Sequence, residues 1–169
     1  MTASLMKKPN SPRATPTPDK SADASLLLLD NQLCFALYSA SLTMTKVYKP
    51  LLAKFDLTYP QYLVLLVLWE KDHCGVSELG ERLFLDSGTL TPLLKRLEAL
   101  EYVVRQRDAR DERRVIVSLA PAGKRLHKQA HAVPQHIMCA TDCSVPELVA
   151  LTAQLTRLRS SLPIISPVA

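Results

Sequence analysis

The side chains with the widest chemical scope in this sequence are its four cysteines. A cysteine thiolate can attack an oxidant and then close a disulfide with a second thiol. Cys34 lies in an apolar stretch, Cys74 follows a histidine, and Cys139 and Cys143 lie close together in MCATDCS. Because the N-terminus has no apolar segment of the kind that directs export, we expect reduced thiols rather than a structural disulfide framework. If one of these cysteines is oxidised, we expect the oxidation to act as a signal.

Two plainer interpretations of these cysteines stay open. A single cysteine on an apolar helix, as Cys34 is expected to be, is usually a small core residue. A second group has the side-chain types that bind zinc, although its spacing fits no common structural zinc site: His131, His136, Cys139 and Cys143. We therefore predict no metal and no cofactor, and we interpret Cys74 as structural or incidental.

The positive charge of the chain is concentrated in its middle. Between Arg82 and Lys128 there are 11 lysines and arginines against 6 aspartates and glutamates, whereas the rest of the chain holds 10 of each. A local basic surface is what phosphate binding needs, because each neutralised phosphate releases counterions. A charged face that is merely solvated has the same composition, so charge alone leaves nucleic-acid binding open.

The spacing of apolar residues predicts helices along most of the chain. Pro50 is expected to bend or end the first helix, since proline lacks a backbone donor and clashes with the preceding turn. Thr58 with Pro60 is expected to start the second, and Ser144 to cap the last. In chain order, the predicted elements are a long helix from 27, helices over 61–71, 76–83 and 89–100, strands over 102–107 and 114–119, and helices over 121–138 and 145–162.

The two short helices over 76–100 predict a helix-turn-helix, and the two strands predict a hairpin with a charged tip. The second short helix has leucines on one side and hydroxyls and cations on the other, so it can present its N-terminal part to base edges. Asp111 at the hairpin tip is expected to orient Arg113 through a charge-assisted hydrogen bond. The candidate DNA-binding residues are Ser87, Thr89, Thr91, Pro92, Lys95, Arg96, Arg110, Arg113 and Arg114.

Residues 76–119, VSELGERLFLDSGTLTPLLKRLEALEYVVRQRDARDERRVIVSL, resemble the winged helix of the MarR family of regulators. The resemblance extends over 27–162 and implies a homodimer that is mainly α with a small β wing, whose N- and C-terminal helices form the dimer interface. Asp111 and Arg113 match the Asp-x-Arg motif of the family's wing, which implies that Arg113 enters the minor groove.

The same pattern predicts how the chain divides into regions. Composition rich in Pro, Ser and Thr predicts a disordered tail at the N-terminus, because such a segment buries too little apolar surface to fold. The predicted regions are this tail over 1–24, a dimerisation region over 25–58 and 121–162, a winged helix-turn-helix over 59–120, and a C-terminal tail over 163–169.

The first helix resembles one branch of that family, the organic hydroperoxide resistance regulators (OhrR), because LLLLDNQLCFALYSAS is followed by KVYKPLL and DLTYPQYLVLLVLWE. The resemblance implies that Cys34 is the peroxide sensor and that Tyr48 and Tyr59 hydrogen-bond its sulfur, which would stabilise the thiolate. Tyr38, four residues along the helix, can also contact Cys34. Cys34 and Tyr48 are fourteen residues apart, about 21 Å along one helix, so their contact requires a second subunit.

The resemblance to two-cysteine members of the branch implies a resolving cysteine near the C-terminus. Cys139 matches that position better than Cys143, which is interpreted as a back-up or a bystander. A sulfenic acid on Cys34 is expected to condense with Cys139 of the partner subunit, and the movement needed to close this disulfide is expected to release DNA. Apolar neighbours of Cys34 are expected to favour organic hydroperoxides over hydrogen peroxide: Leu33, Phe35 and Leu37.

Two other functions remain open from the sequence. One is a MarR-type repressor that binds a small aromatic ligand while Cys34 is passive, and the other is a thiol peroxidase, against which the basic helix and wing argue. The predicted partners of this non-enzymatic repressor are palindromic double-stranded DNA, a second copy of the chain, and organic hydroperoxides. The longest apolar run, 59–69, is about half of the ~20 residues that a membrane span needs, so we expect no membrane contact and a soluble, cytoplasmic protein.

Overall fold

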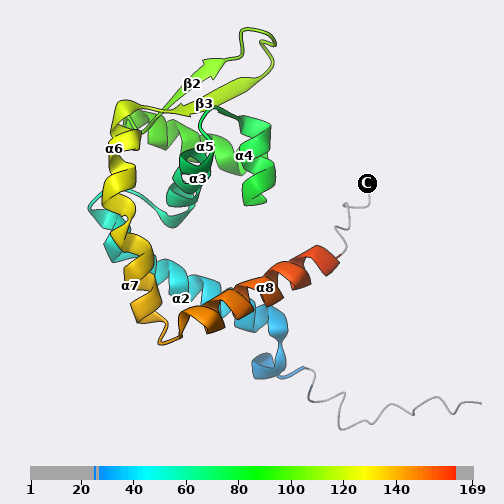
Figure 1. Ribbon diagram of the computed structural model, residues 1–169. Coiled ribbons are helices and arrows are strands. Elements are labelled where there is room, and N and C mark those ends of the chain that lie inside the picture. Colours follow the sequence, from blue (N-terminus) through cyan, green and yellow to red (C-terminus); the bar gives the residue numbers. More distant parts are fainter. Residues whose placement is uncertain (1–24, 26, 163–169) are drawn as a thin grey trace, which may run out of the picture. The chain divides into compact units, whose positions relative to one another are not determined.

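The computed structural model describes Ser25 and residues 27–162, so the two predicted tails lie outside the described residues. The described residues divide into two compact units, with the boundary between Leu42 and Thr43. Helices dominate and one small sheet accompanies them, which confirms the predicted fold class (Figure 1). The elements are η1 (Leu29–Asn31), α2 (Leu33–Ala53), α3 (Tyr59–Glu70), β1 (Cys74–Gly75), α4 (Val76–Leu83), α5 (Ser87–Ala99), β2 (Val103–Arg107), β3 (Val115–Leu119), α6 (Pro121–Ala130), α7 (Ala132–Ala140) and α8 (Val145–Ser161).

The first predicted helix begins later than its apolar pattern indicates. A 3-10 turn, η1, precedes it, and Gln32 is extended before α2 begins at Leu33. The side chain of Asn31 donates to the carbonyl of Ser25 at 2.8 Å, a local bond of the kind that competes with helix formation. At the other end, Pro50 lies inside α2, which continues to Ala53 before it ends.

Helix α3 occupies the centre of the core in the second unit. Its start agrees with the prediction, because Thr58 precedes the helix and its backbone N–H donates to Gln61 Oε1 at 2.8 Å. Most of its circumference is buried, as expected for a helix that is apolar on nearly every side. Buried side chains from the neighbouring helices and strands complete the core around it: Leu52, Leu79, Leu90, Leu94, Leu97, Val103, Val117 and Leu126.

The sheet has three strands in the order β1-β3-β2, all antiparallel, where the sequence predicted only the β2–β3 hairpin. The third strand, β1, has two residues, and Cys74 pairs with Val117 of β3. Cys74 therefore lies in a strand and not in a loop. Its side chain is fully buried, and its Sγ donates to the carbonyl of Lys71 at 3.1 Å, which supports the structural interpretation of this cysteine.

The helix predicted over 121–138 is divided into α6 and α7 at His131. Pro134 accounts for the break, because it cannot donate to the carbonyl of Ala130, the last residue of α6, and its ring clashes there. Helix α6 approaches the hairpin closely at Gly123, where an added Cβ would lie 2.1 Å from the carbonyl oxygen of Tyr102. The same glycine's carbonyl accepts from Trp69 Nε1 at 3.1 Å, which ties α6 to α3.

Helix α8 is capped as predicted, since Glu147 Oε2 accepts from the backbone N–H of Ser144 at 2.8 Å and from its hydroxyl at 2.6 Å. No residue of this helix is buried. Its apolar row is partly or wholly exposed: Leu148, Leu151, Leu155, Leu158 and Leu162. Within the described part of the chain, no helix is long and apolar enough to cross a membrane.

Candidate nucleic-acid interface and redox site

Helices α4 and α5 form the predicted helix-turn-helix. Helix α4 ends at Leu83, and the next residue, Phe84, has a left-handed φ of 56°. Gly80 is needed beside this turn because an added Cβ would lie 2.8 Å from the carbonyl oxygen of Leu85. Asp86 caps α5 and accepts from the backbone N–H of Thr89 at 2.8 Å and from its hydroxyl at 2.9 Å. These hydrogen bonds lower the pKa of Asp86, so the cap is anionic at neutral pH.

The side of α5 away from the core carries the predicted contact residues. Leu90, Leu94 and Leu97 are buried, and the opposite side is exposed at Ser87, Thr89, Pro92, Lys95 and Arg96, with Thr91 half-buried. Both threonine hydroxyls already donate within the protein, Thr89 to Asp86 and Thr91 to the carbonyl of Ser87 at 2.7 Å. Their oxygens can still accept a hydrogen bond, for example from a base amino group.

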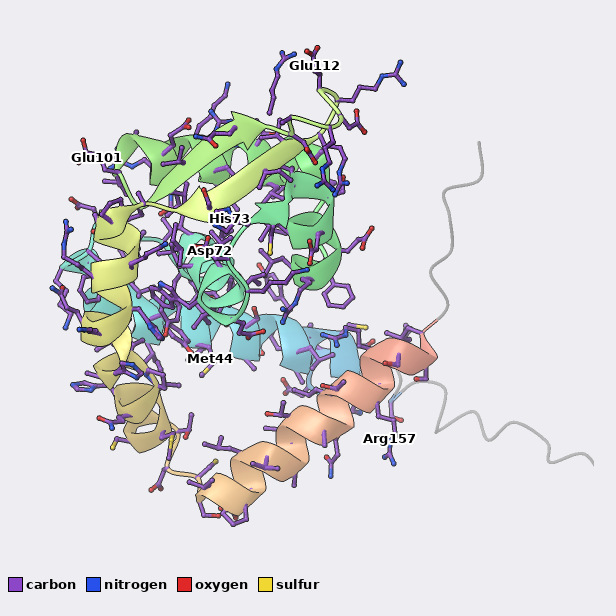
Figure 2. All side chains as sticks on the ribbon, turned by 45° about the horizontal axis from the view of Figure 1, so that its top comes forward. Met44, Asp72, His73, Glu101, Glu112 and Arg157 are labelled. Carbon is purple, nitrogen blue, oxygen red and sulfur yellow. The ribbon has the colours of Figure 1, made fainter. Side chains whose placement is uncertain are left out.

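The tip of the β2–β3 hairpin is ordered by aspartates. Asp108 accepts from the backbone N–H of Arg110 at 2.9 Å, and Asp111 accepts from the backbone N–H of Arg113 at 3.1 Å. The bond between Asp111 and Arg113 was expected to involve the guanidinium, but it is made to the main-chain N–H of Arg113. Arg110, Arg113 and Arg114 are exposed, and Figure 2 shows the labelled Glu112 at this tip, directed away from the protein.

A cavity of about 360 Å³ is lined by residues of both the hairpin and the helix-turn-helix. Thr91 of α5 and the N-terminal residues of α4 line one side, and Arg105, Arg113 and Arg114 line the other. Arg105 is not a free cation, because Glu98 at the end of α5 accepts from its Nη2 at 2.6 Å. This bond lowers the pKa of Glu98. Sequence patterns do not predict this pair, because the two residues are seven apart across a helix end and no short-range pattern links them.

Tyr48 and Tyr59 are brought together from α2 and α3, with 4.4 Å between ring centroids. Tyr62 lies next to them, 6.1 Å from Tyr48. Burial, together with the neighbouring Tyr59 and Tyr62, raises the pKa of Tyr48 to about 12, and burial also raises the pKa of Tyr59. Both hydroxyls are therefore protonated donors at neutral pH. Tyr62 was not among the predicted site residues, although its spacing of three from Tyr59 places it on the same side of α3.

The cysteines other than Cys74 are exposed, and all four are free thiols. Cys34 and Tyr38 belong to the first compact unit and are both exposed on α2. Cys139 lies at the end of α7, and Cys143 lies just before α8 with its Sγ donating to the carbonyl of Thr141 at 3.2 Å. Among the described residues, no three histidine, cysteine or acidic side chains are grouped to hold a metal ion, and this includes the zinc set considered above.

Comparison with known proteins decides the family. Residues 46–130 match the family model of the transcriptional regulators SarA/Rot. The chain is 50% identical over 134 residues to the HTH-type transcriptional regulator TtmR of Methylorubrum extorquens, which covers 79% of this chain and 69% of TtmR. It is 48% identical over 134 residues to the organic hydroperoxide resistance transcriptional regulator of Bacillus subtilis, which covers 79% of this chain and 91% of that protein. The chain is a transcriptional regulator of the MarR/OhrR type.

Solved structures agree with this assignment. The regulator resembles AbfR of Staphylococcus epidermidis; reduced AbfR bound to DNA is 35% identical, with a TM-score of 0.67 over 84% of this chain and 97% of AbfR. Disulfide-formed AbfR is 34% identical, with a TM-score of 0.55 over 83% of this chain and 98% of AbfR. These relatives are DNA-binding transcription regulators and not enzymes. MarR-family regulators are dimers, and among the described residues of this regulator α8 has no buried member.

Proposed function

We propose that this regulator is a homodimeric repressor that senses organic hydroperoxides by oxidation of Cys34 and then releases its palindromic operator. The observation that carries the proposal is the pairing of Tyr48 with Tyr59, whose rings meet and whose hydroxyls stay protonated. Two adjacent donors in a half-buried, apolar setting are suited to stabilise one anion. The resemblance to the hydroperoxide regulators supports the thiolate of Cys34 as that anion.

The DNA-binding part of the proposal is supported by α5 and the wing. The capped N-terminus of α5 presents Ser87, Thr89 and Thr91 to the edges of bases, while Lys95 and Arg96 bind phosphates. The wing arginines, Arg110, Arg113 and Arg114, extend to the neighbouring minor groove and backbone. Reduced AbfR and overoxidized AbfR, relatives of similar fold, are both bound to DNA. This supports the disulfide, and not oxidation of the sensor alone, as the step that releases the operator.

The chemistry at Cys34 proceeds in two balanced steps. Its thiolate sulfur attacks one peroxide oxygen, an S–O bond forms as the O–O bond breaks, and the alkoxide takes a proton and leaves as the alcohol. The sulfur is oxidised to a sulfenic acid. The thiol of Cys139 of the partner subunit then attacks this sulfur, an S–S bond forms, and water leaves. A disulfide-formed state of AbfR supports a disulfide as the end product.

The dimer in this proposal is formed by the terminal helices, over 25–58 and 121–162, around the winged helix of 59–120. Within the described part of the chain, Leu151 and Leu155 of α8 and the following Leu162 are exposed. Exposed leucines are also frequent at the start of α2, at Leu33 and Leu37. Apolar rows of this length are stable in water when a second subunit covers them.

Disulfide mapping and operator binding on the same samples test the proposal. The probe is a duplex that the reduced protein selects from random DNA sequence, and the oxidant is stoichiometric cumene hydroperoxide. We expect a crosslinked dimer on non-reducing gels, a 34–139 peptide pair, and release of the duplex. Cys139→Ser should stop at a sulfenic acid that dimedone traps, whereas Cys143→Ser, the matched control, should behave as wild type.

Two results speak against parts of this account. A crosslink that persists in Cys139→Ser and disappears in Cys143→Ser would transfer the resolving role to Cys143. Steady consumption of excess peroxide with a dithiol reductant, while the duplex stays bound, would favour the thiol peroxidase instead of the repressor.

A further inference from the structure

The side chain of Glu98 holds Arg105 at three points. Glu98 Oε2 accepts from Arg105 Nε at 2.9 Å and from Nη2 at 2.6 Å, and Glu98 Oε1 accepts from the backbone N–H of Arg105 at 3.2 Å. The two side chains are partly shielded, with 27% of Arg105 and 37% of Glu98 exposed. Multiple charge-assisted bonds between one carboxylate and one arginine fix direction as well as distance.

The pair joins the two elements that are proposed to read DNA. Glu98 lies in the last turn of α5, and Arg105 lies in the middle of β2. Strand β2 is an edge of the sheet, so its outward backbone N–H at Arg105 has no strand to pair with, and Glu98 satisfies it. The bond therefore attaches the edge of the wing directly to the recognition helix, in addition to the short connection through Glu101 and Tyr102.

The wing extends well beyond this attachment. Figure 2 shows Glu101 at the end of the hairpin where α5 passes into β2, and Glu112 at the opposite, free tip. Each strand residue adds about 3.4 Å, so a small rotation of β2 at Arg105 displaces the tip by a larger distance. The arginines that depend on this position, Arg113 and Arg114, line the same cavity as residues of the helix-turn-helix.

We propose that Glu98 and Arg105 are a positioning pair, which sets the angle between recognition helix and wing so that both contact the same operator half-site. In this proposal Arg105 acts through Glu98, which accepts from its Nε and Nη2, and not as a phosphate contact. The inference rests on the DNA-binding part of the proposed function and is independent of the chemistry at Cys34.

Reduced protein, without peroxide, provides the test. Operator affinity, hydroxyl-radical protection of the minor groove and dimethyl sulfate protection of guanine N7 are measured for Glu98→Gln, Arg105→Gln and the double variant. Each single variant should weaken binding roughly fivefold, and the double variant should be no weaker than either, since both remove one interaction. Minor-groove protection by the wing should fade while major-groove protection by α5 remains. Glu101→Gln, which removes an exposed carboxylate three residues away, should bind as wild type.

Two outcomes would overturn the inference. If Glu98→Gln tightens binding while Arg105→Gln weakens it, Arg105 contacts phosphate directly and Glu98 merely competes for it. If both variants lose protection in both grooves in proportion to a fall in melting temperature, the pair only stabilises the fold. A wild-type protein that protects no half-site would instead contradict DNA reading itself, which separates failure of the proposed function from failure of the pair.

Discussion

The rings of Tyr48 and Tyr59 lie 4.4 Å apart between centroids and are inclined by 37°, which joins the C-terminal part of α2 to the first turn of α3. Burial raises the pKa of both phenols, that of Tyr48 to about 12. The pair thus presents two protonated hydroxyls that do not titrate at any physiological pH. This is the property that hydrogen bonding to a sensor thiolate requires.

Removal of either hydroxyl should slow oxidation without affecting DNA binding by the reduced protein. Tyr48→Phe and Tyr59→Phe are each expected to lower the rate of Cys34 oxidation by cumene hydroperoxide about tenfold, the effect of one lost hydrogen bond to a charged group. The rate is measured as loss of free thiol in stopped flow. Tyr102→Phe serves as the control, because its hydroxyl donates to the carbonyl of Phe55 at 3.2 Å. If Tyr48→Phe and Tyr59→Phe are both oxidised at the wild-type rate, neither tyrosine hydroxyl takes part in the sensor.

The wing arginine should contribute to affinity and to salt dependence. Arg113→Ala is expected to weaken operator binding about tenfold and to make the dependence of binding on salt less steep. It should also relax the preference for A·T pairs beneath the wing, which is the information a minor-groove arginine reads. Anisotropy titrations between low and physiological salt measure both effects. Arg125→Ala on α6, also exposed, is the control, and equal losses in the two variants would indicate a general charge effect rather than a wing contact.

The cap of the recognition helix should matter for stability and binding together. Asp86→Ala removes the acceptor for the backbone and hydroxyl of Thr89 and should lower the melting temperature by about 4 °C. Operator affinity should fall as well, because the N-terminal turn of α5, which is proposed to face the bases, frays. Asp86→Asn keeps an acceptor and should lose less in both measurements. Thermal unfolding measures the melting temperature, and fluorescence anisotropy measures operator affinity. If Asp86→Ala melts and binds as wild type does, the cap contributes to neither.

Asp72 should make the fold sensitive to acid. Partial burial alone would raise its pKa, but bonds from the backbone N–H groups of Leu119 and His73 and from Lys124 outweigh it and hold the pKa below its ordinary value of 3.8. A lowered carboxyl pKa adds stability above pH 3.8, and this is lost as the pH falls through the folded-state value. Figure 2 shows Asp72 and His73 beside each other near the sheet.

Asp72→Asn should therefore cost about 2 kcal/mol of unfolding free energy at pH 7 and flatten its decline below pH 4. Urea unfolding from pH 7 to pH 3 measures the difference. Asp142→Asn is a matched control, since Asp142 is exposed and its positive φ is one that asparagine tolerates. Parallel pH profiles for wild type and Asp72→Asn would contradict this account of the carboxyl.

The sequence predicted helix starts that depend on hydrogen bonds between residues close together in the chain. Thr58 and Ser144 precede helices as expected, because an N-cap depends on side chains within one turn. The break before α7 was missed although Pro134 indicates it, because the apolar pattern continues through the proline. Strand β1 and the bond from Glu98 to Arg105 could not be predicted, since two-residue strands have no pattern and the pair forms only after α5 packs on the sheet.

The central claim is that oxidation of Cys34 makes the protein release its operator, and one binding experiment tests it. Wild type and Cys34→Ser are bound to the selected duplex in their reduced forms, and anisotropy is followed after addition of stoichiometric cumene hydroperoxide. The account predicts that wild type releases the duplex, that a reductant restores binding, and that Cys34→Ser stays bound throughout. Release by both proteins, or by neither, would contradict Cys34 as the switch and favour a MarR-type repressor that responds to a small aromatic ligand.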